Sequence, residues 1–171
     1  LCEKGVMRVG AKDICITRVH LEEDTGRLVH GEGGASLVDF NRAGVPLMEL
    51  VTEPDIRTAY EAAEFAKKLQ MLFQYLGVSG ANMEKGQMRC EVNISMRKAG
   101  EQFGTKVEIK NLNSFGVVKD AIAYEMKRQT ALLEHGEKVA QETRGWDEHK
   151  TATVSQRMKE SAHDYRYFPE P

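Results

Sequence analysis

Apolar residues recur at the three- and four-residue spacing of an α-helix in two segments of the chain. The first begins at Thr58, where Thr-Ala-Tyr-Glu forms a capping box, and ends near Gly77. The second begins near Ser114 and ends near Gly136. We therefore expect two amphipathic helices. Their expected apolar stripes are Ala62, Phe65, Leu69, Leu72 or Phe73, and Leu76 in the first helix, and Phe115, Val118, Ile122, Met126 and Leu133 in the second.

Other segments alternate apolar and polar residues, which is the pattern of a half-buried strand. Met88–Arg97 alternates strictly over ten positions, and Lys106–Lys110 repeats the pattern. Such strands predict an antiparallel sheet with one buried face, and helices covering that face would give an α+β domain. Further strands are expected at Asp13–His20, Leu37–Phe40, Leu47–Thr52, Val139–Arg144 and Thr151–Met158.

The two alternating strands carry mixed charge on their polar faces. In order, these faces present Arg89, Glu91 and Asn93 on the first strand, and Lys106, Glu108 and Lys110 on the second. A carboxylate set between cations suits a nucleoside triphosphate, because carboxylates hold Mg²⁺ while cations meet phosphate oxygens. The alternative is an exposed sheet face with cross-strand ion pairs. The repetition on two strands favours a site.

Two further acidic segments add candidate metal ligands. His20-Leu-Glu-Glu-Asp24 places Glu23 where it can ligate a divalent ion with help from His20, although a solvated turn is the simpler alternative. Glu49 lies in an apolar strand, where a carboxylate needs a partner to offset its desolvation. That partner can be a metal, or a cation such as Arg42. We therefore expect Glu49 to be buried and functional.

Composition narrows the class of protein. The chain of 171 residues has a net charge of −2, which argues against a wholly basic nucleic-acid binder. No apolar run is long enough to span a membrane, and no secretory signal is visible. The three cysteines are odd in number and far apart, as expected for reduced thiols in the cytosol rather than a disulfide framework.

Several other segments leave alternatives open. Gly31–Ala35 is expected to be a flexible loop or hairpin turn, because it lacks the Lys-Ser/Thr ending of a phosphate-binding loop. Segments 144–147 and 157–166 mix arginine with aromatic residues, which fits either base stacking or packing. Surface exposure is expected for the run Glu125, Lys127 and Arg128, and for His30, His135, His149 and His163.

Six motifs together resemble the GatB family, the B subunits of aspartyl/glutamyl-tRNA amidotransferases. They occur in the family's order over nearly the whole chain and are highly specific. They are His20-Leu-Glu-Glu-Asp24, the segment from Asp39 to Asp55, Met88-Arg-Cys-Glu-Val-Asn93, Val107-Glu-Ile-Lys-Asn-Leu-Asn-Ser-Phe115, Gln141-Glu-Thr-Arg144, and the segment from Asp164 to Pro171.

The resemblance implies a glutamine-synthetase-like catalytic domain in which a curved, mainly antiparallel sheet cradles ATP and Mg²⁺. It implies phosphorylation of the side-chain carboxylate on misacylated tRNA, followed by attack of ammonia delivered by the amidase (the A subunit of the enzyme), with the C subunit stabilising the assembly. The catalytic and metal-binding carboxylates carry over to Glu23, Glu49, Glu91 and Glu108. The expected ATP and phosphate ligands are the cations Arg42, Arg89, Lys106 and Lys110.

The family also implies parts beyond these residues, namely a leading strand with a Gly-Leu-Glu-x-His motif and a C-terminal helical region and tail domain. We therefore expect residues 1–171 to be a partial catalytic domain, truncated at both ends, inactive alone and prone to associate. The location is expected to be bacterial cytoplasm or an organelle. Two alternatives are a non-catalytic tRNA-binding scaffold and a free-standing ligase acting on a small amino acid. The preference between aspartyl- and glutamyl-tRNA is open.

Overall fold

The computed structural model describes residues 2–30 and 36–158, and the chain divides into two compact units, residues 1–56 and 57–171. Both helices were expected, and the mixed α+β class with mainly antiparallel pairing is confirmed. Unit 1 contains strands β1 Cys2–Val9, β2 Lys12–Glu23, β3 Arg27–His30, β4 Ser36–Asp39 and β5 Pro46–Thr52. Unit 2 contains helix α1 Ala59–Tyr75, strands β6 Cys90–Ile94 and β7 Val107–Leu112, helix α2 Phe115–Glu134, and strands β8 Glu142–Asp147 and β9 Ala152–Met158.

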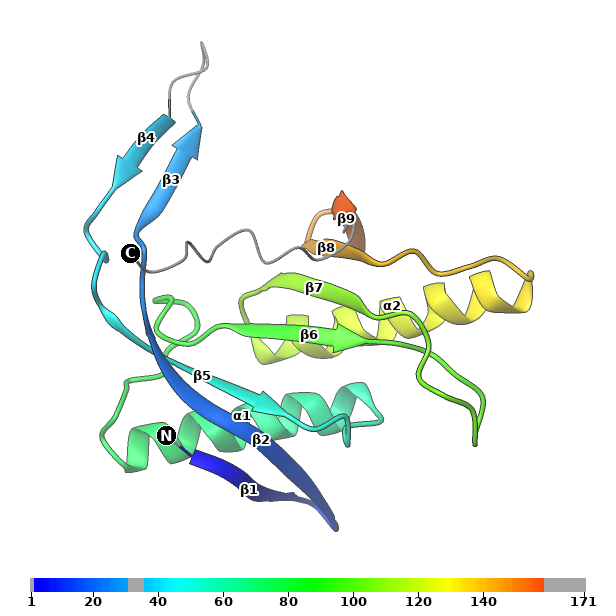
Figure 1. Ribbon diagram of the computed structural model, residues 1–171, viewed down its shortest axis with the longest axis horizontal. Helices are drawn as coiled ribbons and strands as arrows, with labels where there is room; N and C mark the ends of the chain where they lie inside the picture. The colour runs from blue at the N-terminus through cyan, green and yellow to red at the C-terminus, as the bar shows by residue number, and fades with distance from the viewer. Residues whose placement is uncertain (1, 31–35, 159–171) are drawn as a thin grey trace, which may run out of the picture. The chain divides into compact units, whose positions relative to one another are not determined.

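In unit 1, the strands form a three-stranded antiparallel sheet in the order β1-β2-β5 and a separate β3-β4 hairpin. β2 is long and bends along its length (Figure 1), and its pairing with β5 shifts between Ile16 and Arg18. A bulge of this kind increases local twist. β1 was not predicted, because Lys4 and Gly5 interrupt the alternation of apolar and polar residues at its centre. Lys4 has a positive φ of 57° there.

Both helices of unit 2 begin at the expected caps. The Thr58 hydroxyl accepts a hydrogen bond from the Glu61 amide at 3.1 Å, and the Ser114 hydroxyl accepts one from the Val117 amide at 3.1 Å. These bonds satisfy amides that have no partner within the helix. The glycines after each helix, Gly77 and Gly136, have positive φ, as expected for C-terminal stops.

The expected apolar stripes are wrong at Leu76 and Leu133, whereas Phe73, the alternative to Leu72, is half-buried. Leu72, Leu76 and Leu133 are 41%, 59% and 44% exposed. The central apolar positions of both stripes are buried as expected, and small or polar neighbours are buried beside them. The buried residues are Ala62, Ala63, Phe65, Ala66 and Leu69 of α1, and Val118, Ala121, Ile122, Glu125 and Gln129 of α2.

The sheet of unit 2 has the order β6-β7-β8-β9 (Figure 1). β7 pairs parallel with β8, and the other pairs are antiparallel. The parallel pair follows from the connection, because helix α2 carries the chain back between the two strands. α2 packs against β6, β7 and β9, and α1 packs against α2. Val107 and Ile109 are fully buried, so the apolar face of β7 forms part of the core.

The expected strands differ from the observed ones by one residue or more at their ends, and two of them differ most. The ten-residue segment Met88–Arg97 contains a strand of only five residues, because a turn around Gly86 precedes it and a loop begins after Ile94. The strand expected at Val139–Arg144 begins at Glu142 and ends at Asp147. Within residues 2–30 and 36–158, no helix is both long and apolar enough to cross a membrane.

Candidate nucleotide and metal site

Glu91 and Glu108 lie on one face of the unit 2 sheet, joined by the ammonium group of Lys110. The Lys110 Nζ atom lies 3.2 Å from Glu91 Oε1 and 3.6 Å from Glu108 Oε1. β6 and β7 are antiparallel neighbours, with Asn93 opposite Glu108. The expectation that these strands share a sheet and present both carboxylates on the same face is confirmed. The arrangement is a cation held between two acids from different strands.

The two carboxylates differ in their surroundings. The Glu91 side chain is 50% exposed, whereas that of Glu108 is 15% exposed. Glu108 Oε2 accepts a hydrogen bond of 2.9 Å from the hydroxyl of Thr143, which is buried on the neighbouring strand β8. The face is therefore built from three adjacent strands, and its more buried carboxylate is fixed through a hydroxyl that was not among the expected site residues.

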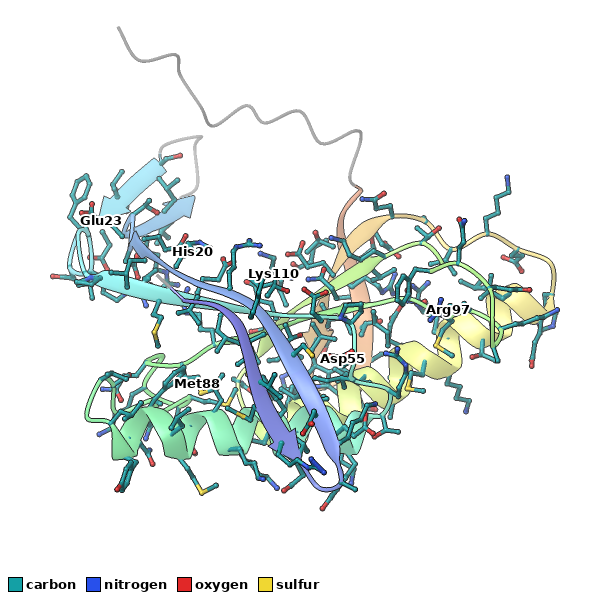
Figure 2. The ribbon with its side chains drawn as sticks, turned by 60° about the horizontal axis from the view of Figure 1, so that its bottom comes forward. His20, Glu23, Asp55, Met88, Arg97 and Lys110 are labelled. Carbon is teal, nitrogen blue, oxygen red and sulfur yellow. The ribbon has the colours of Figure 1, made fainter. Side chains whose placement is uncertain are left out.

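Arg89 and Lys106 lie just outside β6 and β7, and both are exposed. Lys110, within β7, is the expected phosphate ligand that pairs with both carboxylates. Figure 2 labels Lys110, together with Met88 and Arg97 in the segments before and after β6. Phosphate binding by Arg89, Lys106 and Lys110 stays a prediction.

A second polar group lies in unit 1 around Glu49. Its side chain is 47% exposed rather than buried, so the expected desolvation is wrong. The local reason is that the apolar residues on the same face of β5 are not fully covered, since Leu47 itself is 36% exposed. Arg18 Nη2 lies 3.7 Å from Glu49 Oε1, so Arg18 rather than Arg42 is its cation.

The same group includes His20, which lies opposite Glu49 in the pairing of β2 with β5. The ligand atoms of His20, Glu22 and Glu49 all lie within 4.8 Å of one another. Glu23 is the next residue along β2, so strand alternation directs it to the other face. Figure 2 labels His20 and Glu23 on this strand. The described contacts thus bring Glu22, not Glu23, to Glu49.

Arg42 lies near the connection between the sheet and the hairpin of unit 1, where it pairs with Asp24. Its Nε lies 3.6 Å from the buried carboxylate of Asp24, which also accepts a hydrogen bond from the Gly26 amide at 2.9 Å. Gly26 has a φ of +85°, and a Cβ there would lie 2.6 Å from the Asp39 carbonyl oxygen. Only glycine fits without a shift. A phosphate role for Arg42 stays a prediction.

The four expected ligands are therefore divided between two units. Glu23 and Glu49 belong to unit 1, and Glu91 and Glu108 belong to unit 2. Their convergence on one metal stays a prediction. The glycine loop Gly31–Ala35 and the motif from Asp164 to Pro171 lie outside the described residues, as does His163.

A buried ionic cluster on the helix side of the unit 2 sheet was not expected from the sequence. Glu125 of α2 is 0% exposed, so its expected place on a solvated face is wrong. It accepts hydrogen bonds from Arg128 Nε at 3.0 Å, Gln129 Nε2 at 3.0 Å and Thr153 Oγ1 at 2.8 Å, and Arg144 Nε lies 3.6 Å away. Helical spacing could have indicated the burial of Glu125, because it lies between Ile122 and Gln129 on the buried stripe of α2.

Glu142 completes this cluster from β8. Arg144 Nη1 donates to Glu142 Oε1 at 2.6 Å, and Arg128 Nη2 lies 3.6 Å from the same oxygen. Burial by itself would raise the pKa of Glu142, but hydrogen bonds from Ser155 and Arg144 and the charge of both arginines hold it below its usual value. Of the two roles expected for Arg144, base stacking and packing, the structure therefore supports packing within the fold.

Trp146 packs on the same side of the sheet. It is 6% exposed and meets the Tyr124 ring of α2 edge-on, with ring centroids 6.3 Å apart. Its ring is therefore covered and cannot stack on a base in this arrangement. Among the other single residues, His135 and His149 are exposed as expected.

Comparison with known proteins decides the family. A family model described as the GatB/GatE catalytic domain matches residues 1–171. The chain belongs to this family. It is 57% identical over 167 residues to the B subunit of the aspartyl/glutamyl-tRNA(Asn/Gln) amidotransferase of Trichodesmium erythraeum (strain IMS101), covering 94% of this chain and 34% of that protein.

Other relatives agree. Identity is 55% over 176 residues to the protein of the same name from Thermodesulfovibrio yellowstonii (strain ATCC 51303 / DSM 11347 / YP87), covering 100% of this chain and 37% of the relative. It is 53% over 186 residues to the chloroplastic/mitochondrial B subunit of the glutamyl-tRNA(Gln) amidotransferase of Physcomitrium patens, covering 100% and 33%. The chain thus spans about a third of the length of these curated relatives. The family resemblance read from the six motifs is confirmed.

Proposed function

We propose that this chain is the ATP-using part of an enzyme that converts misacylated Glu-tRNA(Gln), Asp-tRNA(Asn) or both into the correctly amidated form. The observation that carries the proposal is the polar sheet face of Glu91, Lys110 and Glu108 in a chain of the GatB/GatE catalytic domain family. Relatives that carry the amidotransferase name cover this chain almost completely.

The donor set on this face fits a hard divalent cation. Glu91 and Glu108 offer carboxylate oxygens from adjacent strands, both within reach of one Lys110 ammonium group. Mg²⁺ prefers such oxygens and binds through one or two carboxylates plus substrate phosphates. When bound with ATP, Mg²⁺ would neutralise charge on the transferring phosphoryl group. Glu23 and Glu49 are the proposed further ligands.

The chemistry explains why ATP is required. A carboxylate is a poor acyl donor because its oxygen is a poor leaving group. Transfer of the γ-phosphoryl group to that oxygen releases ADP and leaves an acyl phosphate. Ammonia then attacks the carbonyl carbon, the carbon–oxygen bond breaks, phosphate leaves, and the nitrogen loses a proton to give the amide.

Lys110 is the residue of this chain best placed to act on phosphate. Its ammonium group is already held at the carboxylate pair, so it would meet the negative oxygens of a nucleotide bound at the same face. Arg89 and Lys106 flank the same strands from exposed positions, and they are the proposed secondary contacts. Arg42 of unit 1 is proposed as a further phosphate ligand, although its described partner is Asp24.

The proposal extends to fold and partners. The fold is proposed to be a glutamine-synthetase-like cradle for the nucleotide. Ammonia would come from an amidase acting as the A subunit, and a C subunit would stabilise the assembly, since relatives are named as B subunits. Bacterial relatives and a chloroplastic/mitochondrial one support action in bacterial cytoplasm or an organelle.

The test is amidation by the full-length chain assembled with its partner subunits. Glutaminyl-tRNA formation is measured from glutamyl-tRNA, ATP, Mg²⁺ and ammonium, so that the amidase step is bypassed. Glu108→Gln is expected to lower the rate by at least about 100-fold. Glu84→Gln, which changes an exposed glutamate of the same unit, is the matched control and keeps the wild-type rate. Equal rates for both variants would reject the proposed site.

The rival function is a tRNA-binding scaffold that performs no chemistry. Two carboxylates on the sheet face argue against it, because they repel the phosphate backbone. Filter binding of tRNA separates the two. Glu108→Gln should leave tRNA affinity unchanged if the face is catalytic, and should strengthen it if the face grips RNA.

A further inference from the structure

The buried hydroxyl of Thr143 has no role in the proposed function as stated above, yet it contacts the more buried of the two sheet-face carboxylates. We propose that Thr143 is a positioning residue for Glu108: its hydroxyl holds one carboxylate oxygen and so presents the other to the cation bound with ATP. This inference rests on the proposed function, because it assigns Thr143 to the same site.

The hydrogen bond fixes the orientation of the carboxylate. Thr143 Oγ1 lies 2.9 Å from Glu108 Oε2, while Lys110 Nζ lies 3.6 Å from Glu108 Oε1. The two oxygens therefore face different groups. An ionised carboxylate only accepts hydrogen bonds, so the threonine must donate. A free glutamate side chain would sample several rotamers, and an anchored one keeps Oε1 at the open side of the face.

Thr143 is itself held firmly. It is 4% exposed and lies directly opposite Glu108 in the parallel pairing of β7 with β8. Its β-branched side chain has restricted rotation about χ1. Its two chain neighbours, Glu142 and Arg144, are tied together in the buried cluster with Glu125 on the helix side of the sheet. Strand alternation then directs the Thr143 hydroxyl to the site side.

A hydrogen bond to a metal-binding carboxylate has measurable consequences for metal affinity. Groups that orient a metal-binding side chain change metal affinity by about 10- to 100-fold when they are removed. Valine has nearly the shape of threonine without the hydroxyl, and serine keeps the hydroxyl without the methyl group. The pair Thr143→Val and Thr143→Ser therefore separates the hydrogen bond from the packing. Thr105→Val provides the same chemical change at an exposed threonine of the same unit.

The experiment measures Mn²⁺ binding to the full-length chain in its assembled complex, in the presence of a non-hydrolysable ATP analogue, by the electron paramagnetic resonance signal of the free ion. Thr143→Val should weaken Mn²⁺ binding by about 10- to 100-fold. Thr143→Ser and Thr105→Val should stay close to wild type. Binding of the analogue without metal should be unchanged in Thr143→Val. Should Thr143→Val not fold, as judged by its thermal unfolding, Thr143→Ala carries the same test.

The outcomes distinguish this inference from the function on which it rests. If Glu108→Gln loses Mn²⁺ binding while Thr143→Val binds as wild type, the positioning role is overturned and the site stands. Equal losses in Thr143→Val and Thr143→Ser would also overturn it, because packing would then be the cause. If Glu108→Gln binds Mn²⁺ as wild type does, the proposed site itself is rejected.

Discussion

Replacing Glu125 with glutamine tests whether the buried ionic cluster holds unit 2 together. The carboxylate is fully buried and accepts hydrogen bonds from Arg128, Gln129 and Thr153, with Arg144 3.6 Å away. Glutamine keeps the shape, so no cavity forms, but it removes the charge that compensates two arginines. Breaking a buried ion pair costs about 3–5 kcal/mol.

The geometry places this substitution near the lower end of that range. Glu142 stays 2.6 Å from Arg144 and 3.6 Å from Arg128, so one carboxylate still compensates the arginines. We therefore expect Glu125→Gln to lower the free energy of unfolding by about 3 kcal/mol. The matched control is Glu64→Gln on α1, which breaks an i,i+3 pair of 2.8 Å with Lys67 that is partly exposed. Its effect should be too small to measure reliably.

The assay is urea unfolding of the 171-residue chain, followed by the fluorescence of its single tryptophan. Trp146 lies on β8 beside the cluster and packs on Tyr124, so its signal reports on this region. A shift of the midpoint at constant slope gives the change in unfolding free energy. If Glu125→Gln is no more destabilising than Glu64→Gln, the buried cluster does not hold unit 2 together.

Three further outcomes are expected. In the assembled complex without nucleotide, Lys110→Met should strengthen Mn²⁺ binding by up to about fivefold, because the two carboxylates lose their shared cation. The control Lys106→Met should leave Mn²⁺ binding unchanged. Weaker Mn²⁺ binding in Lys110→Met would contradict this prediction. Because folding lowers the pKa of Glu142 below its ordinary 4.5, its stabilisation is complete above that value and lost as pH falls through the folded pKa. Glu142→Gln should therefore flatten the fall in unfolding free energy below about pH 4.5 in urea titrations, and an unchanged slope would count against it. Burial raises the pKa of the Cys90 thiol from 9.0 to about 11. In a chain with its other cysteines replaced by serine, the rate of Cys90 alkylation should therefore rise about tenfold per pH unit up to pH 11. A rate that levels off near pH 9 would show an ordinary thiol.

Local signals in the sequence were sufficient for the helices and for one face of the sheet. The caps at Thr58 and Ser114 depend on hydroxyls and nearby amides, which are neighbours in sequence. The alternation around Glu91 and Glu108 fixed which side chains share a face, because a strand directs every second residue to the same side. The pairing of both acids with Lys110 then needed only that the two strands be adjacent.

Features that depend on contacts between residues far apart in the sequence could not be predicted from such local patterns. Glu49 is half exposed although its neighbours are apolar, because its surroundings are set by which elements cover β5. β7 and β8 run parallel because α2 lies between them in the chain, which no strand pattern indicates. Thr143 lies in the motif Gln141-Glu-Thr-Arg144, but nothing in that motif indicates its partner, and only the register against β7 brings its hydroxyl to Glu108.

The family, the two helices, and the acids and lysine that share the unit 2 sheet face could all be predicted from the amino-acid sequence. These depend on motif order, capping and two-residue periodicity, all of which are read within short stretches of chain. Burial and interaction partners became known only from the folded arrangement: Glu125 lies in the core beside two arginines, Arg42 pairs with Asp24, and the Thr143 hydroxyl donates to Glu108. The physical reason is that the environment of a charge is set by the groups folded against it, and those groups come from elements far apart in the chain.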